Sequence, residues 1–226
     1  MTTRLAVFDL DGTLTSKDTY KRFLRQRLRA RPWRAVTCVT LPWHYHVAVS
    51  QRRDHVWLKL KALKAVVAGS SRAELASFAE RFARDVVETD VSAAARDRIA
   101  SHRAAGDNVV LCSASFDFYV EAIGAALGFD QVICTRSSWR NDRLVAAIDG
   151  ENCFGDEKIR RLDAYVARLD STARPTVTAY TDHHSDLPLL EWADVPVAIS
   201  PTKPMRAIAD ERGFAVEMWH AQSAFQ

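Results

Sequence analysis

The stretch "LAVFDLDGTLT", residues 5–15, leads four apolar residues into two aspartates that are separated by one leucine. Continuous apolar runs of this kind are typical of central strands in a parallel sheet, which are covered on both faces. Because side chains alternate along an extended chain, we expect Asp9 and Asp11 on one side and Leu10 in the core. The stretch therefore predicts a buried strand that ends in paired carboxylates.

Two later runs repeat this design and indicate one shared site. The runs "NVVLCSAS" at 108–115 and "TVTAYTD" at 176–182 are apolar, rich in β-branched residues, and carry polar residues at their C-terminal ends. Ligands of parallel sheets lie outside the carboxyl ends of the strands. We therefore expect one site to contain Asp9, Asp11, Ser113 and Asp182.

Helical patterns alternate with these strands. The alternation predicts an α/β fold with a Rossmann-like parallel sheet core and helices on both faces. The segment 137–153 has the turn-forming pair Asn141–Asp142 between two flanks, which predicts a β-hairpin beside the site. The expected helices span 91–106, closed by Gly106, 116–128, closed by Gly128, and 156–170.

Residues 16–88 interrupt this rhythm because they show helical patterns with no strand between them. Ser71 and Glu74 form a capping-box pattern that starts the clearest of these helices. We therefore expect an all-helical cap at 16–88, inserted into a core formed by 1–15 and 89–226.

Composition limits the class of protein. A chain of 226 residues with 48% hydrophobic and 26% charged residues is typical of a soluble globular protein, and its net charge of +3 is too small to indicate nucleic acid as a partner. The N-terminus shows no secretory signal, which predicts a cytoplasmic location. The longest apolar stretch, 35–49, is too short for a membrane span and contains Pro42. The cysteines lack the spacing of a metal or redox motif, and we expect reduced core residues at Cys38, Cys112, Cys134 and Cys153.

The paired aspartates indicate a particular chemistry. Two neighbouring carboxylates repel each other unless a cation lies beside them. Mg²⁺ prefers oxygen ligands and leaves positions for water and a substrate phosphate, and Asp182 offers a further oxygen. Gly12 and Thr13 are expected to turn the chain and expose backbone N–H groups to a phosphate. A simple strand-end turn is the structural alternative, but two buried acids are costly there.

Four motifs in order resemble those of the haloacid dehalogenase-like hydrolases: "DLDGT" at 9–13, Ser113, Lys158 in "GDEK", and "DHHSD" at 182–186. The insertion resembles the helical cap of the phosphoserine-phosphatase-like branch. The resemblance covers nearly the whole chain and implies a phosphate-ester hydrolase, because dehalogenases and the related ion pumps lack an acid at position 11.

The resemblance also implies roles for individual residues. Asp9 would attack phosphorus to form an aspartyl phosphate, and Asp11 would protonate the leaving alcohol and later deprotonate water. Asp186 would support the metal through water or through Lys158. The implied metal-site residues are Asp9, Asp11 through its backbone carbonyl, Asp182 and Asp186, and the implied phosphate-binding residues are Thr13, Ser113 and Lys158.

Several of these residues also have ordinary structural interpretations. Ser113 alone is a common turn residue, and Lys158 alone is equally well a solvated lysine. Asp186, followed by Leu187 and Pro188, makes a good helix N-cap. His183 and His184 are expected to be solvent-facing loop residues.

Asp18 is a candidate substrate-binding residue. It stands where the resembled phosphoserine phosphatases carry a glutamate that binds the substrate amine, and it matches that residue in charge only. The alternative is structural, because Thr15 and Asp18 can form a capping box for the first cap helix. No cap arginine that would bind a carboxylate can be assigned, so the sequence does not specify phosphoserine.

The segment 21–34, "KRFLRQRLRARPWR", has seven basic residues and no acid. A solvated helix face is its ordinary interpretation. Together with the tryptophan-bearing segment that follows, it could instead form an amphipathic surface for an anionic membrane, since some relatives that the cap resembles act on phosphatidylglycerophosphate. Pro32 and Pro42 make one long interfacial helix unfavourable.

These observations predict a Mg²⁺-dependent phosphomonoester hydrolase that acts on a small anionic phosphorylated metabolite. One alternative is a membrane-surface phospholipid phosphatase of the phosphatidylglycerophosphate type. Another is a non-catalytic phosphate-binding regulatory module, although such a module has no need for both Asp9 and Asp11. A phosphotransferase would use the same residues.

Overall fold

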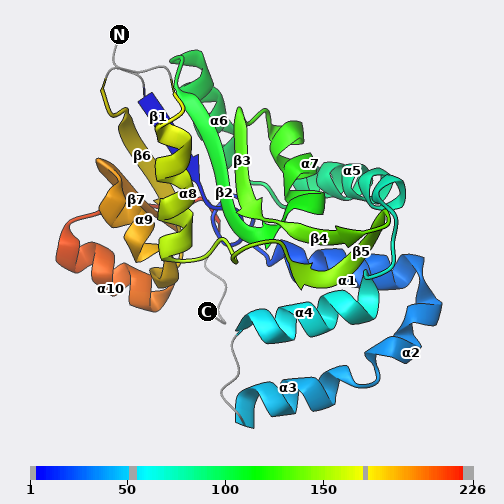
Figure 1. Ribbon diagram of the computed structural model, residues 1–226. Coiled ribbons are helices and arrows are strands. Elements are labelled where there is room, and N and C mark those ends of the chain that lie inside the picture. The colour runs from blue at the N-terminus through cyan, green and yellow to red at the C-terminus, as the bar shows by residue number, and fades with distance from the viewer. Residues whose placement is uncertain (1–3, 51–54, 170–172, 221–226) are drawn as a thin grey trace.

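A computed structural model describes residues 4–50, 55–169 and 173–220, and its centre is a parallel sheet (Figure 1). All neighbouring strands in this sheet run parallel. The sheet confirms the predicted Rossmann-like α/β class. Its six strands lie in the order β3 (Gln131–Thr135), β2 (Asn108–Phe116), β1 (Arg4–Phe8), β6 (Thr176–Thr181), β7 (Val195–Ile199) and β8 (Ala215–Glu217).

Both faces of the sheet are covered by helices, as the side chains of β1 show, because they point alternately to the two faces. Leu5 and Val7 pack in one apolar cluster with residues of α8 (Asp156–Val166), α9 (Leu187–Trp192) and α10 (Lys203–Arg212). Ala6 and Phe8 pack in a second cluster with residues of α6 (Ala93–Ala104) and α7 (Asp117–Leu127). A strand covered on both faces has no need for polar alternation, which explains its continuous apolar sequence.

The predicted hairpin is formed by β4 (Ser137–Arg140) and β5 (Arg143–Ile148). Asn141 and Asp142 have φ values of 48° and 58°, the left-handed conformation that a tight two-residue hairpin turn requires. The hairpin also contacts the helical segment, since Leu144 exchanges backbone hydrogen bonds with Gly69 and Ser70.

Among the described residues between β1 and α6, the chain forms helices and no strand. The isolated bridge between Thr15 and Val91 brings the two ends of this segment together, and α5 packs against α7 of the core. The division into a core of 1–15 and 89–226 and a cap of 16–88 remains a prediction that these contacts favour. The segment contains α1 (Thr19–Ala30), η1 (Pro32–Arg34), α2 (Ala35–Cys38), α3 (Leu41–Ser50), α4 (His55–Val66) and α5 (Arg72–Thr89).

The start of α5 agrees with the predicted capping box in one half only. The Ser71 side chain accepts a hydrogen bond from the Glu74 backbone N–H, as expected. The Glu74 carboxylate does not return to Ser71 but forms ion pairs with Arg27 and Arg31. The solvated-face interpretation of 21–34 is therefore wrong for Arg27, whose side chain is buried.

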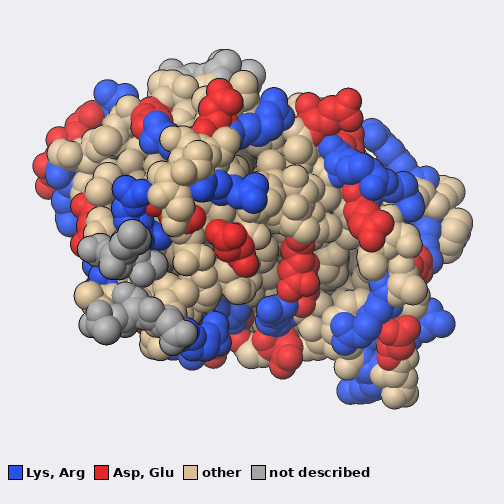
Figure 2. All heavy atoms as spheres, turned by 90° about the horizontal axis from the view of Figure 1, so that it is seen from above, with Lys and Arg blue, Asp and Glu red and all other residues tan. Residues whose placement is uncertain are grey.

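Three of the four cysteines are buried, as predicted, and Cys38 is partly exposed. No helix in the described part of the chain is long and apolar enough to cross a membrane. On the face seen from above, basic and acidic side chains are interspersed (Figure 2), which agrees with the small net charge.

Candidate active site

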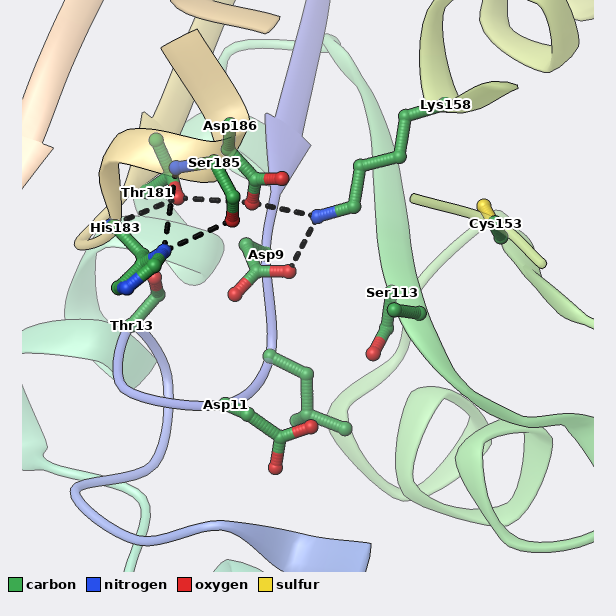
Figure 3. Close-up of polar contacts among 12 residues, drawn as sticks. Asp9, Asp11, Thr13, Ser113, Cys153, Lys158, Thr181, His183, Ser185 and Asp186 are labelled. Atoms are coloured by element: carbon green, nitrogen blue, oxygen red, sulfur yellow. Dashed lines mark hydrogen bonds and ion pairs between the residues drawn. The ribbon is translucent and has the colours of Figure 1, made fainter. Parts of the chain in front are cut away.

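The candidate site lies at the carboxyl ends of β1, β2 and β6 (Figure 3). Asp9 directly follows β1, and its backbone N–H continues the ladder to the Tyr180 carbonyl at 3.0 Å. Asp182 directly follows β6, and Ser113 lies within the C-terminal half of β2. The structure thus brings together polar residues from strands that are far apart in the sequence.

Lys158 is the central cation of the site. Its Nζ lies 2.7 Å from Asp9 Oδ1 and 2.6 Å from Asp186 Oδ2. Its exposed fraction is only 1%, so the solvated-lysine alternative is wrong. Burial opposes its charge, but the carboxylates of Asp186 and Asp9 outweigh this and raise the pKa of Lys158 well above its ordinary value. Lys158 therefore remains protonated between two carboxylates.

Asp186 precedes α9, yet its side chain makes no capping hydrogen bond. The predicted N-cap position is confirmed, but the capping hydrogen bond expected there is not formed by the side chain. Its Oδ2 instead accepts hydrogen bonds from Lys158 Nζ at 2.6 Å and from Thr181 Oγ1 at 3.1 Å. Both donors lie at the carboxyl end of the sheet, so Asp186 orients Lys158.

The turn after β1 is built around Gly12. Gly12 has a φ of +89°, and a Cβ at this position would lie 2.3 Å from Asp182 Oδ2. A glycine is therefore required for Asp182 to approach the turn. Thr13 Oγ1 donates a hydrogen bond to Asp182 Oδ1 at 3.2 Å, and burial raises the pKa of Asp182 to about 7.

The Asp11 carboxylate points away from the Lys158 cluster, toward the start of α1 (Figure 3). It accepts hydrogen bonds from the Thr19 backbone N–H at 2.6 Å and from Ser115 Oγ at 2.8 Å. Burial raises its pKa, which favours a protonated acid. Ser115 was not predicted, although its position two residues after Ser113 on the same strand was a usable signal.

Ser113 is buried, and its hydroxyl oxygen accepts a hydrogen bond from the Ser115 backbone N–H at 3.1 Å. In Figure 3 this hydroxyl points into the space beside Asp9 and Asp11.

Asp18 lies at the N-cap of α1, where its side chain accepts from the Lys21 backbone N–H at 2.8 Å. It also pairs with the Lys21 ammonium at 3.0 Å. The cap predicted at Thr15 is therefore formed by Asp18 itself, while the Thr15 hydroxyl donates to backbone carbonyls, that of Leu10 included.

His183 is partly buried, and its Nδ1 accepts from the Ser185 backbone N–H at 3.2 Å, which caps η2 (His184–Asp186). The neighbouring His184 is exposed, and the two rings lie 4.1 Å apart. The solvent-facing expectation is thus right for His184 only.

Lys59 is a cation of α4 that sequence reasoning missed. Its Nζ donates to the Ala114 carbonyl at 2.6 Å and to Asn152 Oδ1 at 3.0 Å, and lies 4.3 Å from the centre of the Phe116 ring. Burial lowers its pKa to about 8, against the opposing effect of the Asp11 carboxylate. No local pattern distinguishes it from the other lysines of α4, because its contacts are made only in the folded chain.

His220 is a second residue that sequence reasoning missed. Its Nε2 donates to the Thr13 carbonyl at 2.7 Å. Ser200, at a φ of 40°, holds this segment by accepting from the backbone N–H groups of Trp219 and His220 at 3.0 Å each. The turn at Gly12 and Thr13 is thereby supported from residues far along the chain.

The carboxyl oxygens of Asp9, Asp182 and Asp186 are candidate ligands for Mg²⁺. Within the described ranges, no three His, Cys, Asp or Glu side chains form a ready metal-binding group. Among the described residues, Lys158 is the cation in contact with Asp9 and Asp186, and Asp182 adds a third carboxyl group, so carboxyl groups outnumber this cation. Mg²⁺ is commonly bound by only one or two carboxylates, with water and substrate phosphate completing its shell. The residues fit Mg²⁺ of this kind.

The chain is similar in sequence and in fold to several known proteins. Protein CicA of Caulobacter vibrioides is 31% identical, over 94% of this chain and 86% of that protein. Histidinol-phosphatase of Neisseria meningitidis serogroup C is 26% identical, over 94% and 97%. A solved protein with unknown function from Bordetella pertussis Tohama I matches with a TM-score of 0.81 and 28% identity, over 96% of this chain and 98% of that one. The phospho-aspartyl intermediate analogue of phosphoserine phosphatase shares the fold, with a TM-score of 0.64 and 16% identity over 97% and 95%.

A family model of the haloacid dehalogenase-like hydrolases matches residues 6–191, and the chain belongs to this family. It is a phosphatase of this family, since a relative named as a phosphatase matches it over 97% of that relative's length. Solved phosphoserine phosphatases share its fold at 15–16% identity, and the helical cap of that branch remains a prediction.

Proposed function

We propose that the protein hydrolyses a small anionic phosphate monoester with the help of Mg²⁺, through an aspartyl phosphate on Asp9. The observation that carries the proposal is the buried contact of Asp9 with Lys158 at the carboxyl end of β1. The ammonium holds one carboxylate oxygen at 2.7 Å, while Asp9 Oδ2 has no hydrogen-bond partner among the described residues. That second oxygen is the proposed nucleophile.

In the first step, Asp9 Oδ2 forms a bond to phosphorus as the bond from phosphorus to the ester oxygen breaks. Asp11 gives its proton to the leaving oxygen, which departs as an alcohol. The raised pKa of the partly buried Asp11 carboxyl favours the protonated form that this step needs. Lys158 remains charged beside the phosphoryl oxygens, and Ser113 and Thr13 offer hydroxyl and backbone donors to them.

In the second step, Asp11 is a carboxylate and takes a proton from water. The water oxygen bonds to phosphorus as the Asp9–phosphorus bond breaks, which returns Asp9 as a carboxylate and Asp11 as an acid. Thr19 N–H and Ser115 Oγ keep the Asp11 carboxylate in place through both steps.

Mg²⁺ would be held by Asp9, Asp182 and the backbone carbonyl of Asp11, with Asp186 acting through Lys158. When bound, it supplies positive charge that offsets the negative charge of the phosphoryl group. Gly12 supports this assignment, because only a residue without a Cβ allows Asp182 so close to the turn.

The position of Lys59 favours a substrate whose leaving group is anionic or carries hydrogen-bond acceptors. It is a partly buried cation of the helical segment, and its hydrogen-bond partners Ala114 and Asn152 are neutral. A partly desolvated ammonium that is hydrogen-bonded to no carboxylate is stabilised when an anion approaches. Asp18 is already bound to Lys21, so we give it a supporting role through charge rather than direct substrate contact.

Phosphate release from a panel of amino-acid, sugar and nucleotide monoesters, with and without Mg²⁺, tests the proposal. Histidinol phosphate and phosphoserine are included because relatives and structural neighbours carry those names. We expect Mg²⁺-dependent turnover of one class, abolished in Asp9→Asn.

The Asp9→Asn variant is expected to fold and to bind inorganic phosphate. Asp11→Asn is expected to accumulate acid-stable labelled protein after a radiolabelled substrate is added, because water is no longer deprotonated. Turnover by Asp9→Asn near the wild-type rate would contradict the assignment of Asp9 as the nucleophile. Phosphate binding without turnover of any ester would favour the regulatory alternative.

A further inference from the structure

The outer part of the helical segment exposes an unusual number of large apolar side chains. They lie in η1, α2 and α3 and at Val39 between α2 and α3, and none of these three elements contains a buried residue. Six of the nine exposed large apolar side chains of the described chain lie here, each between 62% and 74% exposed. We name them the outer cap surface: Trp33, Val36, Val39, Trp43, Tyr45 and Val49.

The outer cap surface is remote from the sheet. Helix α3 packs on α4, where the rings of His44 and Trp57 meet edge to face with centres 5.4 Å apart. In Figure 1, α3 lies at the bottom of the molecule, on the side of α4 that faces away from the sheet. The tryptophans of this surface therefore contribute to no core among the described residues, and their exposure calls for another partner.

Positive charge precedes this apolar surface in the chain. No aspartate or glutamate occurs between Asp18 and Asp54. Arg25 and Arg29 of α1 are exposed and have no carboxylate partner in the described part of the chain, and Arg34 donates to the Ala68 carbonyl at 2.7 Å. The basic residues of 21–34 thus divide into those that hold the segment together, such as Arg27, and those that remain free.

We propose that the outer cap surface docks reversibly on an anionic lipid bilayer. Tryptophan and tyrosine are enriched at the level of the lipid headgroups, and clusters of basic residues are attracted by anionic lipids. Helix α3, with 10 residues, is too short to cross a bilayer, so it would lie at this interface rather than across it. A second copy of the chain fits less well, because a symmetric interface would bring the free arginines of both copies together.

Sedimentation with vesicles tests the proposal. The full chain is mixed with vesicles of equal parts phosphatidylglycerol and phosphatidylcholine, and with vesicles of phosphatidylcholine alone. We expect binding to the anionic vesicles only, falling as salt rises. The Trp33→Ala/Trp43→Ala variant is expected to lose about tenfold or more in partitioning, and Arg25→Gln/Arg29→Gln about tenfold.

Matched controls keep the test specific. Val195→Ala removes an exposed apolar side chain from β7, outside the helical segment. Lys203→Gln/Arg206→Gln removes two positive charges from α10. Both variants are expected to bind vesicles like the wild type. Hydrolysis of a soluble ester should be unchanged in the tryptophan variant, because the outer cap surface contains no residue of the candidate site. The inference therefore stands or falls independently of the proposed reaction.

Three outcomes would overturn the proposal. One is absence of binding to anionic vesicles at low salt. The second is equal binding by the tryptophan variant. The third is a concentration-dependent dimer that the tryptophan changes dissociate, without vesicle binding, which would assign the surface to self-association.

Discussion

Lys158 balances the charge of the candidate site. It is the described cation that contacts both Asp9 and Asp186, and all three side chains are buried. Breaking a buried ion pair by removing one partner leaves an uncompensated charge, which is far more costly than losing a surface pair. The effect of this residue should therefore appear in stability as well as in activity.

We expect Lys158→Met to lower the free energy of unfolding at neutral pH by about 3–5 kcal/mol. Ester hydrolysis should fall by about a hundredfold or more, because a cation beside the phosphoryl group is lost. Urea unfolding without Mg²⁺ measures the first effect and phosphate release the second. Arg160→Gln, an exposed change on the same helix, is the control and should unfold like the wild type.

The double variant Lys158→Met/Asp186→Asn separates charge balance from catalysis. It should recover part of the lost stability, because one of the two stranded carboxylates is removed, while hydrolysis remains low. A single variant that unfolds at the wild-type urea concentration would refute this role for Lys158.

Gly12 allows a second comparison between single residues. Gly12 and Gly150 both have positive φ values, +89° and +80°, so Ala at either position is strained by about 1–3 kcal/mol. Only at Gly12 does the added Cβ meet Asp182; at Gly150 nothing lies within 4 Å. We expect Gly12→Ala to lose Mg²⁺-dependent hydrolysis and Gly150→Ala to retain it. Equal activities at matched stability would show that the approach of Asp182 does not matter.

At this scale the sequence predicted residues with strong local patterns. Two of them, Asp9 and Asp182, directly follow buried parallel strands, and Lys158 lies in the first turn of a helix. The alternation of strands and helices therefore brings them to one edge of the sheet. Lys59 and His220 have no such pattern. Each reaches the site by a contact that exists only after helices and the chain ends have packed.

Helix α4 connects the helical segment to the core through Lys59. Because burial lowers the pKa of Lys59 from 10.5 to about 8, the unfolded chain binds a proton that the folded chain has lost between these values. The contribution of Lys59 to stability must therefore rise with pH across this window. Its interaction with Ala114 and Asn152 would shift correspondingly from an ammonium to an amine contact.

We expect the unfolding free energy of the wild type, relative to Lys59→Met, to increase as pH rises from 8 to 10.5. Urea unfolding of both proteins over this range measures the difference. Lys64→Met, an exposed change on the same helix, serves as the control and should show a flat difference. A flat or falling difference for Lys59 would mean that the ammonium is not buried in solution.

The whole molecule divides into parts of different packing. Helix α5 buries six side chains, whereas α3 buries none. Local opening is easiest where few apolar contacts must be broken. Without lipid, amide hydrogens of α3 should exchange with solvent about a hundredfold or more faster than those of α5, as measured by hydrogen–deuterium exchange with mass spectrometry. Equal protection of the two helices would contradict this packing.

The fold was predictable from the sequence where local patterns decide the packing, and not where contacts between distant residues decide it. The parallel sheet, the hairpin at Asn141–Asp142 and the start of α5 at Ser71 follow from local patterns that agree with the final packing. The interior of the helical segment does not. Arg27 belongs to a strongly basic run, and only the approach of Glu74 from α5 makes its burial favourable.

The contact between His220 and Thr13 also orders events during synthesis. The turn after β1 is made before its support, which comes from a residue 207 positions later. Strand β1 itself lies between β2 and β6, so it lacks one of its two neighbours until β6 has left the ribosome. The contacts of this turn are therefore complete only after His220 has been synthesised, long after Gly12 and Thr13 themselves.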